Sequence, residues 1–146
     1  MKIQRFYVEG EPLAWAAPKV TKRGTFDIRS AYKKSVTWTL TAQKHEFPNT
    51  IEGPVRVTIY FFFAVPKSFS KKKQEAIKRG ETRHITKPDR TNCLKLFEDC
   101  VERAGIIGND SQIVEGEAKK YYCTYDPPGI RRRYSVPHTY IEITEL

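Results

Sequence analysis

The sequence predicts a single small α/β (α+β) domain, with a mixed β-sheet packed by two to three helices. Three observations support this fold class. The chain has 146 residues, enough for one domain with its own core and too few for two comfortable ones. Hydrophobic residues make up 39% and charged residues 29%, a composition typical of globular proteins. Strand-like and helix-like segments alternate along the chain without a repeat. We therefore expect one domain over residues 1–146.

The N-terminal half predicts two strands and a helix. Residues 2–9 intersperse apolar and polar side chains, which favours a first strand. Residues 14–26 are basic and contain proline and glycine, so we expect an irregular loop or a loose hairpin there. Ser30 is a plausible N-cap for a helix over residues 31–45. Residues 54–65 are rich in β-branched and aromatic side chains on both faces, which indicates a central strand covered on both sides.

The C-terminal half predicts two helices and two more strands. A short lysine-rich helix should end at Gly80. Between Pro88 and Gly105 apolar residues recur at intervals of three and four, the pattern of an amphipathic helix. Residues 112–125 then read as a long strand, and a proline-rich turn separates it from a closing strand over residues 139–144.

The net charge is +9 and the isoelectric point is near 9.5, which favours a polyanionic partner such as nucleic acid. A basic surface that serves solubility is the alternative. Dense basic clusters typically contact phosphates. Phe69, just ahead of the lysine-rich helix, could wedge between DNA bases or pack in the core. The candidate DNA-binding residues are Phe69, Lys71, Lys72, Lys73, Lys119, Lys120, Arg131, Arg132 and Arg133.

The cysteines and the N-terminus favour a reduced, cytoplasmic setting. Cys93, Cys100 and Cys123 are odd in number and lack the close spacing of a zinc ribbon or a disulfide scaffold. Cys93 and Cys100 are seven residues apart on the expected helix, so we expect both to pack in its apolar face. The N-terminus lacks the apolar core of a signal peptide, and the apolar run over residues 59–65 is too short to span a bilayer. We expect no membrane partner.

Acidic residues around the expected helix after Pro88 suggest a metal site. Carboxylates contact DNA poorly unless a cation lies between them and the phosphate. Asp89 lies at the start of the helix, Lys95 and Asp99 share a stripe with Asn92, and Asp110 begins the next strand. If that strand packs against the helix, the three aspartates can converge. Mg²⁺ prefers such carboxylate oxygens and keeps water sites open for phosphate, with Mn²⁺ as the alternative ion.

The chemistry that fits these residues is attack of a metal-activated water on a phosphodiester. Lys95 would stabilise charge in the transition state or hold the scissile phosphate. Structural alternatives exist for each residue. Asp89 would be a plain N-cap, Lys95 and Asp99 a surface pair, and Asp110 a turn residue. The joint spacing of these residues favours the catalytic interpretation.

The chain resembles the RusA-type Holliday junction resolvases, small DNA endonucleases of phages and prophages. The resemblance rests on residues 87–95, Lys-Pro-Asp-Arg-Thr-Asn-Cys-Leu-Lys, on Asp99, and on residues 109–114, Asn-Asp-Ser-Gln-Ile-Val. It extends more weakly to the N-terminal third. It implies a homodimeric, Mg²⁺-dependent enzyme in the cytoplasm of a bacterial or phage-infected cell. Such an enzyme recognises four-way DNA junctions or other branched DNA and cuts two strands symmetrically. Carried over by position, the metal ligands would be Asp89 and Asp110 and the catalytic lysine Lys95.

Two positions depart from the pattern of this family. Thr91 replaces the second aspartate of Asp-x-Asp-Asn, and Asn109 replaces the first of two paired acids. Asp99 is then the favoured compensating metal ligand, with Glu115 and Glu117 as further candidates. The alternative is a protein that binds branched DNA with weak or no nuclease activity. A phosphotransfer enzyme acting on a nucleotide is a third class, but no Gly-rich phosphate loop supports it.

Overall fold

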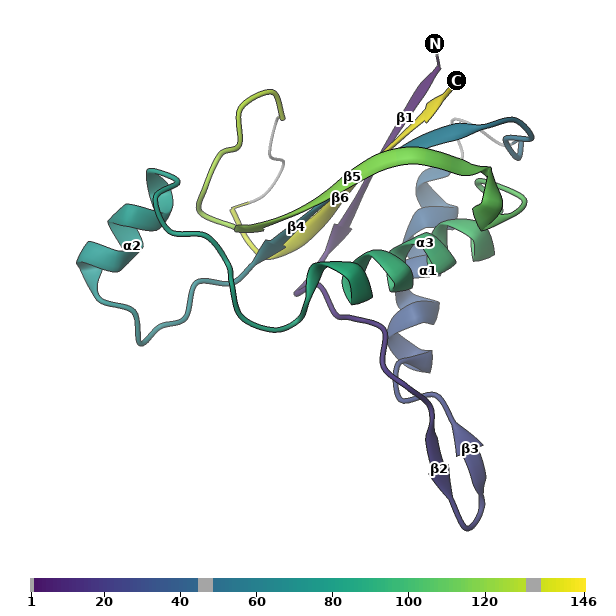
Figure 1. Ribbon diagram of the computed structural model, residues 1–146, viewed down its shortest axis with the longest axis horizontal. Helices are drawn as coiled ribbons and strands as arrows, with labels where there is room; N and C mark the ends of the chain where they lie inside the picture. Colours follow the sequence, from purple (N-terminus) through teal and green to yellow (C-terminus); the bar gives the residue numbers. More distant parts are fainter. Residues whose placement is uncertain (1, 45–48, 131–134) are drawn as a thin grey trace.

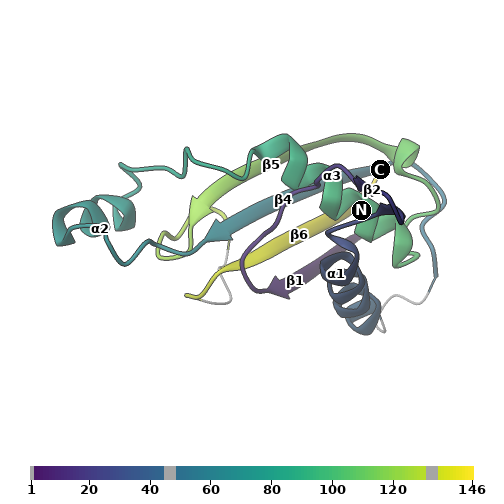
Figure 2. The same ribbon diagram turned by 90° about the horizontal axis from the view of Figure 1, so that it is seen from below.

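A four-stranded mixed sheet lies at the centre of the computed structural model, which describes residues 2–44, 49–130 and 135–146. The strands are β1 (Ile3–Glu9), β4 (Val55–Phe63), β5 (Ile113–Tyr122) and β6 (His138–Glu145), in the order β1-β6-β4-β5. β4 runs antiparallel to β6 and parallel to β5. Helices α1 and α3 lie on one face of this sheet (Figures 1 and 2). The predicted α+β fold with a mixed sheet is therefore confirmed.

β4 is the central strand that its sequence predicts. Phe61 and Phe63 are buried in the larger core on the helix-covered side. Tyr60 and Phe62 are buried in a second, aromatic cluster on the opposite face. Because side chains alternate along a strand, a strand covered on both sides needs apolar residues at successive positions. This explains the unbroken apolar run of β4.

Helix α1 (Ser30–Gln43) begins one residue earlier than it would if Ser30 were its N-cap. Arg29 is the N-cap residue and makes no side-chain capping bond, so the prediction for Ser30 was wrong. Asp27 instead accepts hydrogen bonds from the backbone at the start of the helix. Its carboxylate accepts the Arg29 N–H (2.8 Å), and its carbonyl accepts the Ser30 N–H (3.2 Å). The predicted end of the helix at residue 45 lies outside the described residues.

Helix α3 (Arg90–Arg103) packs its apolar face against the sheet and α1, as its periodicity predicts. Leu96 and Phe97 are fully buried, and so are Cys93 and Cys100. Burial raises the pKa of each of these two thiols to about 11. The prediction that both cysteines pack as small apolar side chains is confirmed.

Two elements project from this body (Figure 1). The first is a hairpin of β2 (Lys19–Thr21) and β3 (Gly24–Phe26), which confirms the loose-hairpin alternative. The second is helix α2 (Lys71–Lys78), whose N-cap Ser70 accepts the Lys73 N–H (3.2 Å). None of the helices in the described ranges is long and apolar enough to cross a membrane.

Candidate active site

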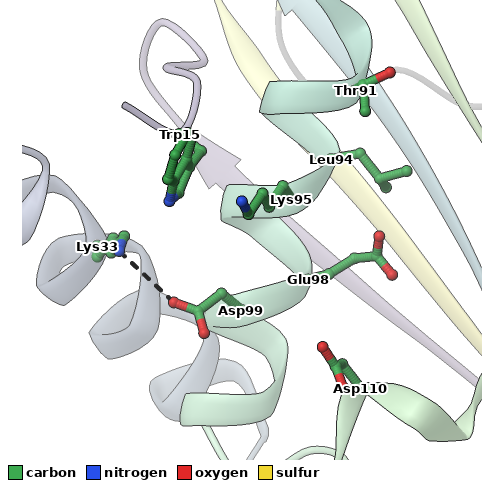
Figure 3. Close-up of a pocket in the computed structure, with 8 residues that line it drawn as sticks. All are labelled: Trp15, Lys33, Thr91, Leu94, Lys95, Glu98, Asp99 and Asp110. Carbon is green, nitrogen blue, oxygen red and sulfur yellow. Dashed lines mark ion pairs between the residues drawn. The ribbon is translucent and has the colours of Figure 1, made fainter. Parts of the chain in front are cut away.

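Three of the predicted site residues line one pocket, which has a volume of about 490 Å³ (Figure 3). Lys95 and Asp99 come from α3, and Asp110 comes from the short 3-10 helix η2 (Asp110–Gln112). The packing of η2 beside α3 creates this arrangement. The pocket is lined by Trp15, Lys33, Thr91, Leu94, Lys95, Glu98, Asp99 and Asp110.

Asp89 lies in a neighbouring pocket with Asn92, and Trp15 lines both pockets. The Asp89 side chain caps α3 by accepting the Asn92 N–H (2.8 Å). Its second oxygen accepts a bond from the Asn92 side-chain amide (3.3 Å). The N-cap interpretation of Asp89 is therefore confirmed, and its exposed carboxylate stays available to solvent. Of the three aspartates expected to converge, Asp99 and Asp110 share a pocket and Asp89 lies beside it.

Lys95 contacts an aromatic residue that the sequence interpretation did not single out. Its ammonium nitrogen lies 3.7 Å from the ring centroid of Trp15, within cation–π range. The Trp15 loop is fixed to α3 because the Trp15 N–H donates to the Asn92 carbonyl (2.9 Å). A tryptophan in an irregular loop offers no periodic signal, so only the fold could place it next to Lys95.

Asp99 has two cationic partners. It pairs with Arg103 on the next turn of α3 (3.1 Å) and with the buried Lys33 of α1 (3.8 Å), and Figure 3 shows its carboxylate turned toward Lys33. These partners differ from Lys95, the partner expected for a surface pair. Lys33 also pairs with Asp27 (2.9 Å), which ties α1, α3 and the segment before α1 together. The metal role of Asp99 stays a prediction.

Asn109 has a structural role at the start of η2. The Asn109 side chain caps η2 by accepting the Ser111 N–H (2.8 Å). The Gln112 side-chain oxygen in turn accepts the Asn109 N–H (2.9 Å), which completes a capping box. An amide oxygen serves this purpose as well as a carboxylate does. The adjacent Asp110 is the acid of this segment that lines the pocket (Figure 3).

Glu98 is the acidic pocket residue that the sequence interpretation missed. Its carboxylate lies on the side of α3 that faces Asp110 (Figure 3). Burial raises the pKa of the Glu98 carboxyl, and the charge of Asp110 raises it further. The available signal was spacing: Glu98 follows Thr91 by seven residues, which returns to the same helix face. The sequence interpretation gave its attention to the neighbouring Asp99 instead.

The donor set of this pocket fits a hard divalent cation. Glu98 and Asp110 offer carboxylate oxygens, the ligands that Mg²⁺ prefers. Within the described ranges, no three His, Cys, Asp or Glu side chains are grouped so that they could hold a metal ion. Mg²⁺ is commonly bound by one or two carboxylates, with water and substrate phosphates completing its octahedron. A two-carboxylate site is therefore sufficient for this ion.

The predicted DNA-binding residues lie in different environments. Lys71, Lys72 and Lys73 are exposed on α2, and Lys119 is exposed on β5. Lys120 is half-buried and donates to the Thr86 carbonyl (2.7 Å), and burial lowers its pKa. The arginines at positions 131, 132 and 133 lie outside the described residues. DNA contact by these residues stays a prediction.

Phe69 and His84 both pack against aromatic residues of the core. The Phe69 ring meets Tyr122 edge to face at a centroid distance of 6.0 Å, and the Lys73 ammonium lies 3.8 Å from its centroid. His84 stacks on Phe63 at 3.9 Å. These contacts support the packing alternative for Phe69, while its role as a DNA wedge stays a prediction.

Comparison with known proteins identifies a family and a relative. The sequence model of the family described as "Endodeoxyribonuclease RusA" matches residues 9–144, nearly the whole chain. The uncharacterised protein YqaN of Bacillus subtilis (strain 168) is 35% identical over 125 residues. That alignment covers 81% of this chain and 87% of YqaN.

Proposed function

This chain belongs to the RusA endodeoxyribonuclease family, and from this premise we propose that it is a Mg²⁺-dependent endonuclease that resolves four-way DNA junctions. Membership implies a Holliday junction endonuclease, and hence a hydrolase acting on phosphodiester bonds. The proposed products are paired, symmetric nicks. Branched DNA is the proposed substrate, and the net charge of +9 fits a polyanion.

The observation that carries this proposal is the shared pocket of Lys95 and Asp110. A cation, a carboxylate and an open cavity at one place are what hydrolysis of a phosphodiester requires. Both residues occupy the positions that the family resemblance gives to the catalytic lysine and a metal ligand. Asp89, the other ligand by resemblance, lies at the adjacent pocket beyond Trp15.

In the proposed mechanism Asp110 would hold the cation, and Asp89 in the adjacent pocket would be its second ligand by resemblance. When bound, Mg²⁺ lowers the pKa of a coordinated water and offsets phosphate charge. The water oxygen forms a bond to phosphorus as the bond to one ester oxygen breaks. The attacking water releases one proton to solvent, and the departing ester oxygen takes up one proton from solvent to become a hydroxyl. Lys95 stabilises the extra negative charge of the transition state. Trp15 positions the Lys95 ammonium through the cation–π contact.

A homodimer is part of this proposal because a two-fold protein matches a junction that is cut twice with two-fold symmetry. Each subunit would then cut one strand. Sedimentation analysis of the purified protein should give the mass of two chains, and a monomer at working concentrations would contradict the paired-cut scheme.

A second candidate function is binding of branched DNA without cleavage. Thr91 favours it, because the family pattern has a carboxylate at this position. The basic clusters are compatible with either function. Cleavage, rather than binding, is therefore the measurement that separates the two.

The test is incubation of the protein with a labelled, immobile four-way junction and with a matched linear duplex, in Mg²⁺ and in EDTA. Symmetric nicks in the junction alone, formed with Mg²⁺ and absent with EDTA, are the expected result. Tight binding of the junction without cutting in Mg²⁺ or Mn²⁺ would favour the second candidate.

Asp110→Asn tests the site itself. This variant should lose cleavage by at least about 100-fold, a typical effect of removing a group that acts at the transition state. It should bind the junction as tightly as the parent protein or more tightly, because a negative charge has been removed. Glu9→Gln removes the same charge from the exposed end of β1, at the opposite edge of the sheet from β5, and should cleave normally. Equal cleavage by both variants would reject Asp110 as a site residue.

A further inference from the structure

We infer that Glu98 is a ligand of the divalent cation, paired with Asp110, and that it replaces the carboxylate that the family motif has at position 91. This inference rests on the proposed function, because that function brings the cation to the pocket. It assigns to Glu98 a role that the family pattern gives to another position.

The geometry of α3 brings position 98 to the same pocket as position 91. Thr91 and Glu98 are seven residues apart, about two helical turns, and both line the pocket that contains Asp110. Figure 3 shows Thr91, Leu94 and Glu98 along the same side of the helix, with the Glu98 carboxylate nearest to Asp110. The longer side chain of glutamate extends from the helix into the space above η2. Thr91 has no carboxylate where the family motif has one, and Glu98 supplies a carboxylate at the other end of the same pocket.

Glu98 and Asp110 bring two negative charges to one pocket. Glu98 is half-buried between α3 and β5, and its carboxylate shares the pocket with that of Asp110. Two carboxylates that face each other in a partly desolvated pocket repel. A divalent cation between them would convert this repulsion into attraction and supply charge where burial is costly. The pair is therefore unfavourable alone and favourable with a cation.

The other candidate acids differ from Glu98 in their partners. Asp99 is paired with Lys33 and Arg103. Glu115 is paired with Arg56. Glu117 accepts the Tyr60 hydroxyl (2.6 Å) and pairs with Lys119. Each of these acids already has a donor or a cation as its partner, and Glu115 and Glu117 do not line the pocket of Asp110. Glu98, by contrast, lines the same pocket as the carboxylate of Asp110.

The experiment measures binding of Mn²⁺ by electron paramagnetic resonance of the free ion, and of Mg²⁺ by isothermal titration calorimetry, without DNA. Glu98→Gln should weaken binding of both ions by at least tenfold, because even changes in the groups around a ligand cost about 10–100-fold. Glu9→Gln, the matched charge control, should bind as the parent does. Thermal melting by circular dichroism verifies the fold of each variant. Glu98→Asp, which keeps the charge, should lie between the parent and Glu98→Gln.

Two further variants make the inference specific. Asp99→Asn distinguishes the neighbouring acid: a larger loss of Mn²⁺ affinity in Asp99→Asn than in Glu98→Gln would overturn the inference. The double variant Thr91→Asp, Glu98→Gln restores an acid at the position used by the family and should regain most of the lost affinity. Failure to regain it would reject the exchange between positions 91 and 98.

Cleavage of the four-way junction separates this inference from the proposed function. Loss of Mn²⁺ binding in Glu98→Gln, with a parent protein that never cuts a junction, would support the ligand and reject the endonuclease. Normal Mn²⁺ binding and normal cleavage by Glu98→Gln would reject the ligand and support the endonuclease. A parent protein that binds neither ion would overturn the ligand assignment.

Discussion

The partly buried His84 should make the stability of the fold depend on pH. It stacks on Phe63 and lies near Lys120, and burial followed by that positive charge lowers its pKa to about 4. The unfolded chain binds a proton at this residue below pH of about 6.5. The folded state binds this proton only below a pH of about 4. The free energy of unfolding therefore decreases as pH falls from about 6.5 to about 4, and below pH 4 His84 causes no further decrease.

His84→Phe should remove this dependence while keeping the ring stack on Phe63. The measurement is the difference in Tm between the two proteins as a function of pH. The parent should lose Tm relative to the variant as pH falls through the window from about 6.5 to about 4. From about pH 7 to 8 the two curves should run parallel, because His84 is neutral in both states there. A constant difference across the whole range would contradict the lowered pKa.

At the residue scale, the sequence predicts some of the side chains that gather in the pocket but not how they pair. Lys95 and Asp110 were expected to lie together and do share a pocket. The roles of Asp99 and Glu98 depend on α1, because Lys33 turns Asp99 away from Asp110. Helical spacing places these two adjacent acids about 100° apart and leaves open which of them faces η2. Lys33, the residue whose ion pair sets the direction of the Asp99 carboxylate, lies on α1, far earlier in the chain.

At the scale of elements, the start of β5 contains an irregularity that its sequence does not predict. Val55 pairs with Ile113 and Arg56 with Glu115, so Val114 is an extra residue in the strand. Such a bulge bends a strand and re-aims its side chains. Two positions later Gly116 has φ +154° and lies against the Val57 carbonyl of β4. This close approach brings the backbones of β4 and β5 together at Gly116.

Gly116→Ala should therefore destabilise the protein. The added Cβ would overlap the Val57 carbonyl oxygen, which is backbone and cannot rotate away. Overpacking of this kind costs about 1–3 kcal/mol, and we expect the upper end. The Tm should fall by roughly 6–12 °C for a loss of about 3 kcal/mol.

Gly53→Ala is the control for this change. It lies in an open environment without a positive φ, so its Tm should stay within about 2 °C of the parent. Equal melting of the two variants would show that β4 and β5 can separate at Gly116 at little cost.

The elements themselves were largely predictable because each has a strong local pattern. The apolar spacing of α3 and the continuous apolar run of β4 reflect burial on one face and on two faces, respectively. The start of α1 was misplaced because Asp27, three residues before Ser30, organises it through both side chain and backbone. Caps depend on chain geometry as well as on residue type.

At the scale of the whole molecule, positive charge is concentrated where the fold projects. Lys71, Lys72 and Lys73 are exposed on α2, which extends away from the sheet (Figures 1 and 2). Lys19 is exposed at the base of the β2–β3 hairpin, and Lys22 is exposed in the turn at its far end. The sequence predicts the charge, and only the fold shows that it lies on two extensions of the body. We expect these extensions to follow the phosphates of a branched substrate.

Replacing Lys71, Lys72 and Lys73 together by alanine tests this expectation. Alanine keeps the helix, so the change removes charge while leaving α2 formed. Each phosphate contact adds about 0.9 to the slope of log K against log salt concentration, so the slope should shrink by about 2.7 if each lysine holds one phosphate. Junction affinity by fluorescence anisotropy, at several salt concentrations in EDTA, gives this slope.

Lys34→Ala, on the exposed side of α1, is the comparison and should leave the slope unchanged within about 0.5. Cleavage at saturating protein should persist in the triple variant, because α2 contributes no side chain to the pocket of Lys95 and Asp110. A triple variant with the slope of the parent protein would place the phosphate contacts elsewhere. A variant that binds normally but no longer cuts would instead place α2 at the reaction centre, which the positions of Lys95 and Asp110 do not predict.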